Sequence, residues 1–299
     1  MQPGRYLSLP TTDVHIVDSG GSGRLVLLVH GLGGQHTNFL DVRDDLRRLG
    51  HVVSIDLPGF GLSPPLDAHE VTAFADVVAE TVEALGSPAL LIGNSMGGLV
   101  CELVASERPD LVEGLVLIAP ATHTFRSPPA SPAIAARLAL HSFRVPGTIV
   151  ASRYRRLLTP EEQALATLEL VALDSEKISS EVRSASLEMA AIRRTMPWAI
   201  RAFVESAASI RRTLLDRARI DHVISSISAP TLLLNGAADE IVTPAAIATL
   251  ARRRPDWTWF EHPQAGHVPQ MEDPAWVTDH ITAWATEALP KRAEPTLEP

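Results

Sequence analysis

The chain holds a single cysteine, Cys101, among its 299 residues. One thiol excludes a disulfide within the chain and suits a reducing compartment, and we expect Cys101 to be buried as a small apolar side chain. No apolar run reaches the roughly 18 residues that a membrane span requires. Residues 1–6 lack the basic-then-apolar pattern of a secretory signal. These absences predict a protein without a membrane span, located in the cytoplasm.

An excess of positive charge is also missing. The chain carries 26 Lys and Arg against 35 Asp and Glu, a net charge of −9, which argues against non-specific binding to nucleic acid or anionic membrane. The sequence contains no metal-ligand spacing, phosphate-binding loop, dinucleotide fingerprint or repeat. We therefore expect no metal and no cofactor, a small molecule as the substrate, and a monomer or homodimer.

Strand-like and helix-like segments alternate through the first 118 residues. Short apolar runs predict buried strands, whereas apolar residues at three- to four-residue spacing predict helices. Loosely alternating residues at 6–18 predict one or two edge strands. The strands are expected at 25–29, 51–55, 89–92 and 114–118, with helices at 38–49, at 70–85 and after residue 95. This order predicts a parallel sheet with helices on both faces.

The alternation stops at residue 121 and resumes at 231. Residues 121–228 hold helical segments and no strand-like run, whereas strands at 231–235 and 257–261 and helices at 244–254 and 274–289 complete the pattern. We predict a core formed by 1–120 and 229–299. Residues 121–228 then form a helical cap over the carboxyl edge of the sheet, where open α/β sheets bind ligands.

The charge of the cap differs from that of the core. Residues 122–222 hold 15 Lys and Arg against 10 Asp and Glu, although the whole chain is acidic. A basic cap could favour anionic substrates. We prefer the simpler interpretation that these arginines are solvated and dock onto acidic core helices.

Residues 89–105 are the most informative stretch. An apolar run at 89–92 leads into Gly93-Asn94-Ser95-Met96-Gly97-Gly98, and apolar residues at helical spacing follow. A serine at a tight turn from strand to helix is exposed above the sheet, because the flanking Gly93 and Gly97 let the two elements converge. The helix N-terminus also favours developing negative charge. Ser95 is therefore the candidate nucleophile.

A serine hydroxyl needs a base to remove its proton. Among eleven histidines, His267 lies in a loop directly after the last predicted strand, at the same edge of the sheet as Ser95. His262 is close in sequence but is expected at the end of the strand itself. We therefore select His267 as the base.

A carboxylate that orients the histidine should follow a neighbouring strand. Asp239 comes soon after the 231–235 strand, with Glu240 as a neighbour that could be mistaken for it. The end of the 114–118 strand offers no acid in residues 119–121. Asp239 is therefore the candidate orienting acid, and its simpler role would be to end the strand or cap a helix.

Taken together, these motifs resemble the α/β-hydrolase superfamily. The order Ser95, Asp239, His267 is the order of the triad in that fold. The resemblance covers 25–118 and 229–290 and implies an α/β fold with a mostly parallel eight-stranded sheet. It rests on five motifs, each at a strand end: His30-Gly31, Asp56-x-x-Gly59-x-Gly61-x-Ser63, Gly-x-Ser95-x-Gly, the Asp239 loop and Gly266-His267.

The resemblance implies a mechanism in which His267 takes the proton of Ser95 and Asp239 holds the imidazole. Backbone N–H groups of Leu32 and Met96 would bind the oxyanion. Candidate substrate contacts are Gly31, Gly33, Trp198, Phe203 and Val268. His30 is interpreted as a brace for its own loop, and Asp56 as a turn-forming residue.

Departures from particular subfamilies favour an ester hydrolase. Ser95 stands where related dehalogenases and epoxide hydrolases carry aspartate, and Leu32 where haloperoxidase-like members carry tryptophan. Hydrolases that cleave carbon–carbon bonds in ring-cleavage products resemble Ser95-Met96-Gly97-Gly98 but commonly have tryptophan where Val268 stands. We predict hydrolysis of an ester with a small to medium apolar acyl group. Carbon–carbon bond hydrolysis and a ligand receptor that retains the triad remain alternatives.

Overall fold

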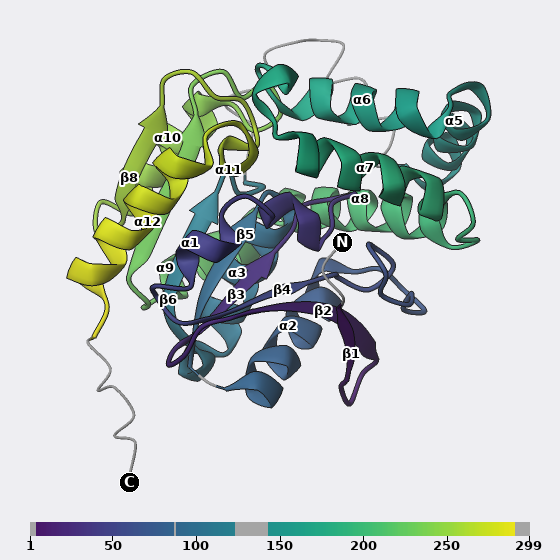
Figure 1. The fold of residues 1–299 in the computed structure, drawn as a ribbon. Helices are drawn as coiled ribbons and strands as arrows, with labels where there is room; N and C mark the ends of the chain where they lie inside the picture. Colours follow the sequence, from purple (N-terminus) through teal and green to yellow (C-terminus); the bar gives the residue numbers. More distant parts are fainter. Residues whose placement is uncertain (1–3, 87, 123–142, 291–299) are drawn as a thin grey trace, which may run out of the picture.

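The computed structural model describes residues 4–86, 88–122 and 143–290 (Figure 1). Its eight strands form one sheet in the order β1-β2-β4-β3-β5-β6-β7-β8. The strands are β1 (Arg5–Ser8), β2 (Asp13–Gly20), β3 (Leu25–Val29), β4 (His51–Ile55), β5 (Ala89–Asn94), β6 (Val112–Ile118), β7 (Thr231–Gly236) and β8 (Thr258–His262). β1 and β2 pair antiparallel, as do β2 and β4, and the remaining pairs are parallel. The predicted fold class is confirmed.

Helices cover both faces of the sheet and create two apolar cores. In β3 the alternate residues Leu25, Leu27 and Val29 face the first core, and Val26 and Leu28 face the second. The first core is closed by α2 (Val71–Leu85), α3 (Met96–Glu107), α9 (Arg217–Ser226) and α10 (Pro244–Arg253). The second is closed by α1 (Arg43–Leu46) and α12 (Pro274–Ala288). Burial on both faces explains why the strand reads as an unbroken apolar run.

The helix predicted at 38–49 is wrong in its extent. The segment forms a 3-10 turn, η1 (His36–Phe39), and the single-turn helix α1. Leu40 N–H bonds to Thr37 C=O and Val42 N–H to Phe39 C=O, so the first turns are too tight for an α-helix. The apolar side chains still reach the sheet, which is why their spacing imitated a helix.

Only helices are found between β6 and β7 in the described part of that segment. They are α5 (Arg144–Leu157), α6 (Pro160–Val171), η3 (Ser175–Lys177), α7 (Ser180–Arg193), α8 (Ala199–Leu215) and α9. Figure 1 shows α5 to α8 as a separate group beside the sheet. A short helix, α11 (Pro269–Glu272), precedes α12. No helix in the described ranges combines the length and the apolar character needed to cross a membrane.

Candidate active site

Ser95 lies between β5 and α3 in a strained backbone conformation. Its φ of 55° is in the region that residues other than glycine rarely adopt. A Cβ on Gly93 would lie 2.4 Å from Gly97 O, and a Cβ on Gly97 would lie 2.1 Å from Val29 O. Strand and helix therefore converge only because both flanking residues are glycine.

The backbone of Ser95 is fixed on both sides. Its N–H donates to Ile118 O of β6 at 3.0 Å, and its carbonyl accepts from the N–H groups of Leu99 and Ala121. These bonds join the turn to β6, to α3 and to the segment after β6. The serine is thus held in one position before any ligand arrives.

His267 and Asp239 are joined by a short hydrogen bond. His267 Nδ1 lies 2.7 Å from Asp239 Oδ2, and both side chains are buried. The other carboxylate oxygen, Oδ1, accepts the N–H groups of Ile241 at 2.8 Å and Val242 at 2.9 Å. The carboxylate is therefore fixed by backbone amides on one oxygen and free to orient the imidazole with the other.

Two residues that the sequence reasoning missed hold the His267 loop. Asn94 Nδ2 donates to His267 O at 3.3 Å and to Ile118 O at 3.0 Å. Glu272 is buried, and its carboxylate accepts Gly266 N–H at 2.8 Å. Asn94 directly precedes the candidate nucleophile, which is the one sequence signal that could have identified it.

The loop of Gly31 approaches the elbow closely. A Cβ on Gly31 would lie 3.0 Å from Ser95 Cβ, and Gly33 has a φ of +72°. Leu32 lies between them. Met96 is the first residue of α3, where an N–H group has no partner within the helix. The backbone N–H groups of Leu32 and Met96 thus belong to the two segments that meet at Ser95.

His30 braces this loop from inside the protein. Its Nδ1 donates to Gly31 O at 2.8 Å, and its Nε2 accepts Leu57 N–H at 3.0 Å. Burial lowers the pKa of His30 to about 4, so the ring is neutral at physiological pH. The predicted bracing role of His30 is confirmed by these bonds.

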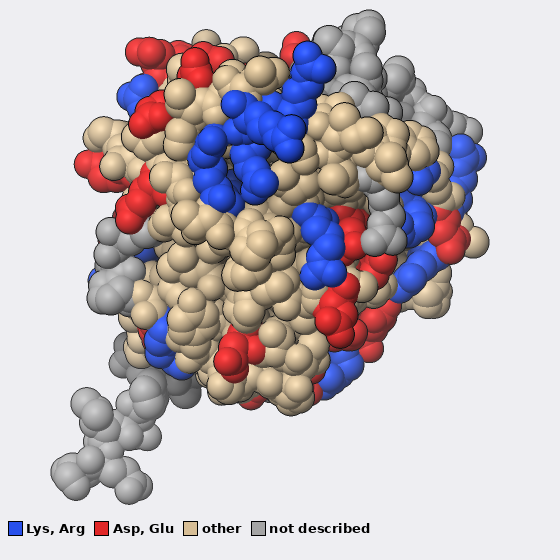
Figure 2. Space-filling model, turned by 90° about the vertical axis from the view of Figure 1, so that its right-hand side faces the viewer, with Lys and Arg blue, Asp and Glu red and all other residues tan. Residues whose placement is uncertain are grey.

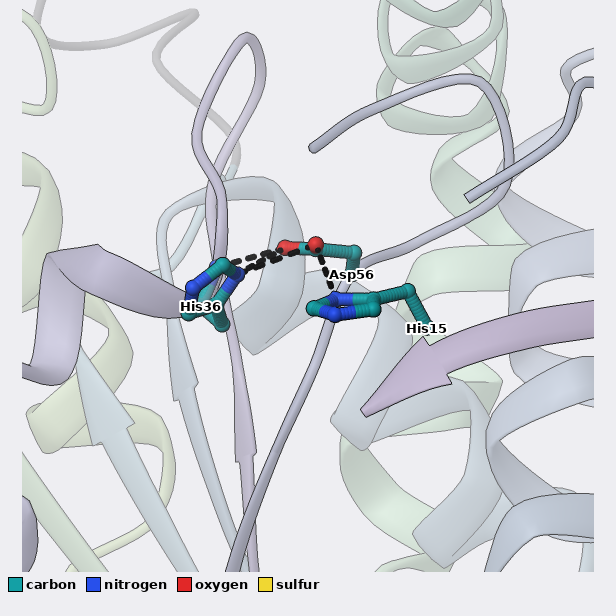
Figure 3. Close-up of side chains that lie close together, drawn as sticks. All are labelled: His15, His36 and Asp56. Atoms are coloured by element: carbon teal, nitrogen blue, oxygen red, sulfur yellow. Dashed lines mark hydrogen bonds and ion pairs between the residues drawn. The ribbon is translucent and has the colours of Figure 1, made fainter. Parts of the chain in front are cut away.

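Asp56 is more than the turn-forming residue that the sequence suggested. Figure 3 shows the imidazoles of His15 and His36 pointing at its carboxylate. His15 Nδ1 lies 2.8 Å from Oδ2, and His36 Nδ1 lies 3.0 Å from both oxygens. The backbone N–H groups of His36 and Leu62 also donate to this carboxylate. Hydrogen bonds to the ionised form hold the pKa of Asp56 well below its usual range, despite burial.

These three residues form the one group in the described ranges whose donor atoms could share a metal ion, since the atoms lie within 4.8 Å of one another. All three side chains are buried. The carboxylate of Asp56 already accepts four N–H groups, which uses its hydrogen-bonding capacity without a metal. We therefore describe the group as a hub that joins β2, η1 and the loop after β4.

Ser95 and His267 open into one cavity of about 550 Å³. Of the candidate substrate contacts, Gly31, Gly33, Phe203 and Val268 line it, as does Leu32. Trp198 is not among the lining residues. In the described residues no hydrogen bond joins Ser95 Oγ to His267, a contact that often forms only once a substrate is bound.

The wall opposite the strand ends comes from α5 to α8. It includes apolar side chains such as Val150, Leu168 and Ile200, and the cations Arg155, Arg193 and Arg194. Figure 2 shows Lys and Arg side chains gathered in the upper half of the face that carries the ends of α5, α7 and α8.

Comparison with known proteins shows the family. The family model described as alpha/beta hydrolase fold matches residues 24–274. A pimeloyl-[acyl-carrier protein] methyl ester esterase from Chromobacterium violaceum is 30% identical over 263 residues, which cover 85% of this chain and 91% of that protein. A protein of the same name from Neisseria meningitidis serogroup A is 29% identical over 249 residues, 82% of this chain and 71% of that protein.

Solved structures have the same fold. An esterase from Thermogutta terrifontis with malate bound has a TM-score of 0.73 and 26% identity, covering 96% of this chain and 100% of that chain. A lipase described as putative, from Acinetobacter baumannii, has a TM-score of 0.76 and 22% identity, covering 96% and 91%, and shows the fold alone.

Proposed function

This chain belongs to the α/β-hydrolase family, and we propose that it hydrolyses carboxylic esters through Ser95, His267 and Asp239. The observation that carries the proposal is the 2.7 Å bond between His267 Nδ1 and Asp239 Oδ2. An ionised Asp239 accepts the Nδ1 proton, so Nε2 of the neutral imidazole is left unprotonated and can act as a base. Ser95 and His267 line the same cavity.

The reaction then has two halves. His267 removes the hydroxyl proton as Ser95 Oγ attacks the ester carbonyl, and the Leu32 and Met96 N–H groups stabilise the oxyanion. The intermediate collapses to an acyl-enzyme, and the departing alkoxide takes the proton from His267. Water, deprotonated by the same histidine, attacks the acyl carbonyl, and the acid is released as Ser95 regains its proton.

We further propose that 121–228 acts as a cap that selects the substrate, over a core of 1–120 and 229–299. In support, helices α5 to α8 supply much of the cavity wall, and the side chains there are largely apolar. The relatives named as methyl ester esterases support a substrate with a small alcohol group and a longer acyl group.

A methyl ester of a medium-chain acid tests the proposal. Ser95→Ala should lower kcat at least roughly 10³-fold and abolish labelling by a fluorophosphonate probe. Ser225→Ala, at an exposed serine on α9, is the matched control and should change neither readout. Undiminished ester hydrolysis by folded Ser95→Ala contradicts the proposal. Turnover of a ring-cleavage product without ester turnover, or tight ligand binding without turnover, would favour the alternative functions.

A further inference from the structure

Arg193 is a cation placed in the wall of the candidate active-site cavity. It is the last residue of α7 and lines the same cavity as Ser95 and His267. The wall around it is largely apolar, with Ala190 on the same helix and Ile200 and Phe203 on α8. A charged side chain in such surroundings loses hydration, which costs free energy unless a partner offsets it.

The protein partners of Arg193 are uncharged. Its Nη2 donates to Gly34 O at 3.1 Å and to Gln35 Oε1 at 3.0 Å. The amide of Gln35 is itself oriented, because its Nε2 donates to Thr37 Oγ1 at 2.6 Å. These bonds fix the guanidinium against the loop that holds Leu32. They leave the Nε–H and both Nη1–H donors of Arg193 for a ligand.

No carboxylate contacts Arg193 in the described ranges, and residues 123–142, which lie outside them, contain no Asp or Glu. Asp56 is the acid whose charge acts on it, but that carboxylate accepts four other N–H groups. Other arginines here do have acidic partners: Arg24 pairs with Glu113, and Arg212 with Glu70.

Arg193 nevertheless carries its charge at neutral pH. Loss of hydration lowers its pKa to about 10, which is still well above 7. Arg193 therefore offers a positive charge that no carboxylate contacts in the described ranges, in a cavity wall that also carries Arg155 and Arg194. A singly charged, planar carboxylate suits a guanidinium better than a doubly charged group does.

The separation between Arg193 and Ser95 is limited by the loop between them. A Cβ on Gly31 would touch Ser95 Cβ at 3.0 Å, and Gly34 N–H bonds to Gly31 O, which closes a tight turn. Because such a turn spans less than about 7 Å, these contacts place the guanidinium no more than roughly 18 Å from the nucleophile. An acyl chain of medium length, with a contact distance at each end, fits within that limit.

We propose that Arg193 binds a carboxylate at the far end of the substrate's acyl chain, so that the preferred substrate is a half-ester of a linear dicarboxylic acid. The ester end lies at Ser95 and the free carboxylate at Arg193. The inference rests on the proposed ester hydrolysis and names its substrate class.

Half-esters and diesters of the same diacid provide the test, because they differ only in the distal charge. The readout is the ratio of kcat/KM for the monomethyl ester to that for the dimethyl ester, measured for linear diacids of four to ten carbons. The wild-type ratio should exceed one, with a maximum at an intermediate length. Arg193→Gln should lower that ratio roughly 10- to 100-fold, the usual effect of losing a charge-assisted hydrogen bond.

Two further variants control for charge and for folding. Arg183→Gln removes the same charge from α7 outside the cavity and should leave the ratio unchanged. Arg193→Lys keeps the charge without the planar donor set, so its kcat/KM ratio should lie between that of wild type and that of Arg193→Gln. If Arg193→Gln does not fold, the wild-type ratio and the lysine variant still decide the matter.

A wild-type ratio of one or less at every chain length overturns the inference. So does an Arg193→Gln variant that slows half-esters and diesters equally, because Arg193 would then only fasten α7 to the Gly34 loop. Both outcomes are distinct from failure of the proposed function, in which Ser95→Ala would hydrolyse either ester as fast as the wild type.

Discussion

Asp239 meets His267 with one carboxylate oxygen and the backbone with the other. Oδ2 lies 2.7 Å from His267 Nδ1, whereas Oδ1 accepts the N–H groups of Ile241 and Val242. These separate partners determine how the side-chain amide of an asparagine would be oriented in place of the carboxylate. An oxygen is required at the position of Oδ1, where two N–H groups point.

Asp239→Asn should therefore abolish most activity while the protein stays folded. Its carbonyl would occupy the Oδ1 position and its NH₂ would face His267 Nδ1, which forces the imidazole proton onto Nε2. The histidine can then no longer accept the serine proton, and kcat should fall roughly 10²- to 10⁴-fold. Steady-state kinetics on a methyl ester measures the loss.

Glu240→Gln is the matched control, since Glu240 is the exposed neighbour of Asp239. It should keep activity within about twofold, as surface changes usually do. Comparable losses in the two variants would mean that the loop, rather than the carboxylate of Asp239, matters.

Gly97→Ala should destabilise the protein more than an ordinary glycine substitution does. The added Cβ would lie 2.1 Å from Val29 O, a backbone atom that cannot move without shifting β3. We expect a loss of at least about 3 kcal/mol in the free energy of unfolding. Gly23→Ala is the comparison: Gly23 has a positive φ, but its added Cβ meets nothing within 4 Å, so about 1 kcal/mol is expected from the backbone conformation alone. Urea unfolding of both variants checks the difference, and equal losses would contradict it.

The elbow and the Asp239–His267 pair could be predicted because their signals are local. Each candidate side chain follows an apolar run, and the carboxyl ends of parallel strands meet at one edge of the sheet. Gly93 and Gly97 are a second local signal for Ser95, because an added Cβ on either glycine would clash with backbone atoms. Residues far apart in the chain were thus placed together by the sheet.

The roles of other residues could not be predicted, because they depend on tertiary contacts that leave no repeating pattern in the sequence. Asp56 was interpreted as a turn former, because its partners His15 and His36 lie 41 and 20 residues away and neither occupies a motif. Trp198 was chosen as a large cap side chain, yet it is not among the residues that line the cavity. Arg193 was one of fifteen basic residues in 122–222, and only three-dimensional packing singles it out.

His30 should make the protein less stable in mild acid. Its folded-state pKa of about 4 lies below the ordinary value of 6.5, so between these values the unfolded chain binds more protons than the native state. The stabilising effect of the neutral ring is complete above pH 6.5 and is lost as the pH falls towards 4. The loss can reach about 3 kcal/mol.

The measurement is the free energy of unfolding as a function of pH for wild type and His30→Gln. The glutamine has no proton to gain in this range, so its curve should be flatter between pH 6.5 and 4. His222→Gln, at an exposed histidine, should follow the wild-type curve. A His30→Gln curve parallel to the wild type would show that the acid sensitivity arises elsewhere.

Glu102 should make the protein less stable in mild base. It is buried in α3, its Oε1 has no hydrogen-bond partner in the described part of the chain, and burial raises its pKa from 4.5 to about 8. The native state therefore binds more protons than the unfolded chain between these values. Stability is greatest below pH 4.5 as far as this group is concerned, and it declines as the pH rises to 8.

Glu102→Gln removes the titration and keeps the size of the side chain. Relative to wild type, the variant should gain a few kcal/mol in unfolding free energy between pH 5 and pH 9. Glu287→Gln, at an exposed position of α12, should show no such gain. Because Glu102 lies two turns along the helix that begins at the elbow, ester hydrolysis at pH 9 should also survive longer at elevated temperature in the Glu102→Gln variant. An unfolding free energy that differs from wild type by the same amount at both pH values would mean that Glu102 does not bind its proton in the folded protein.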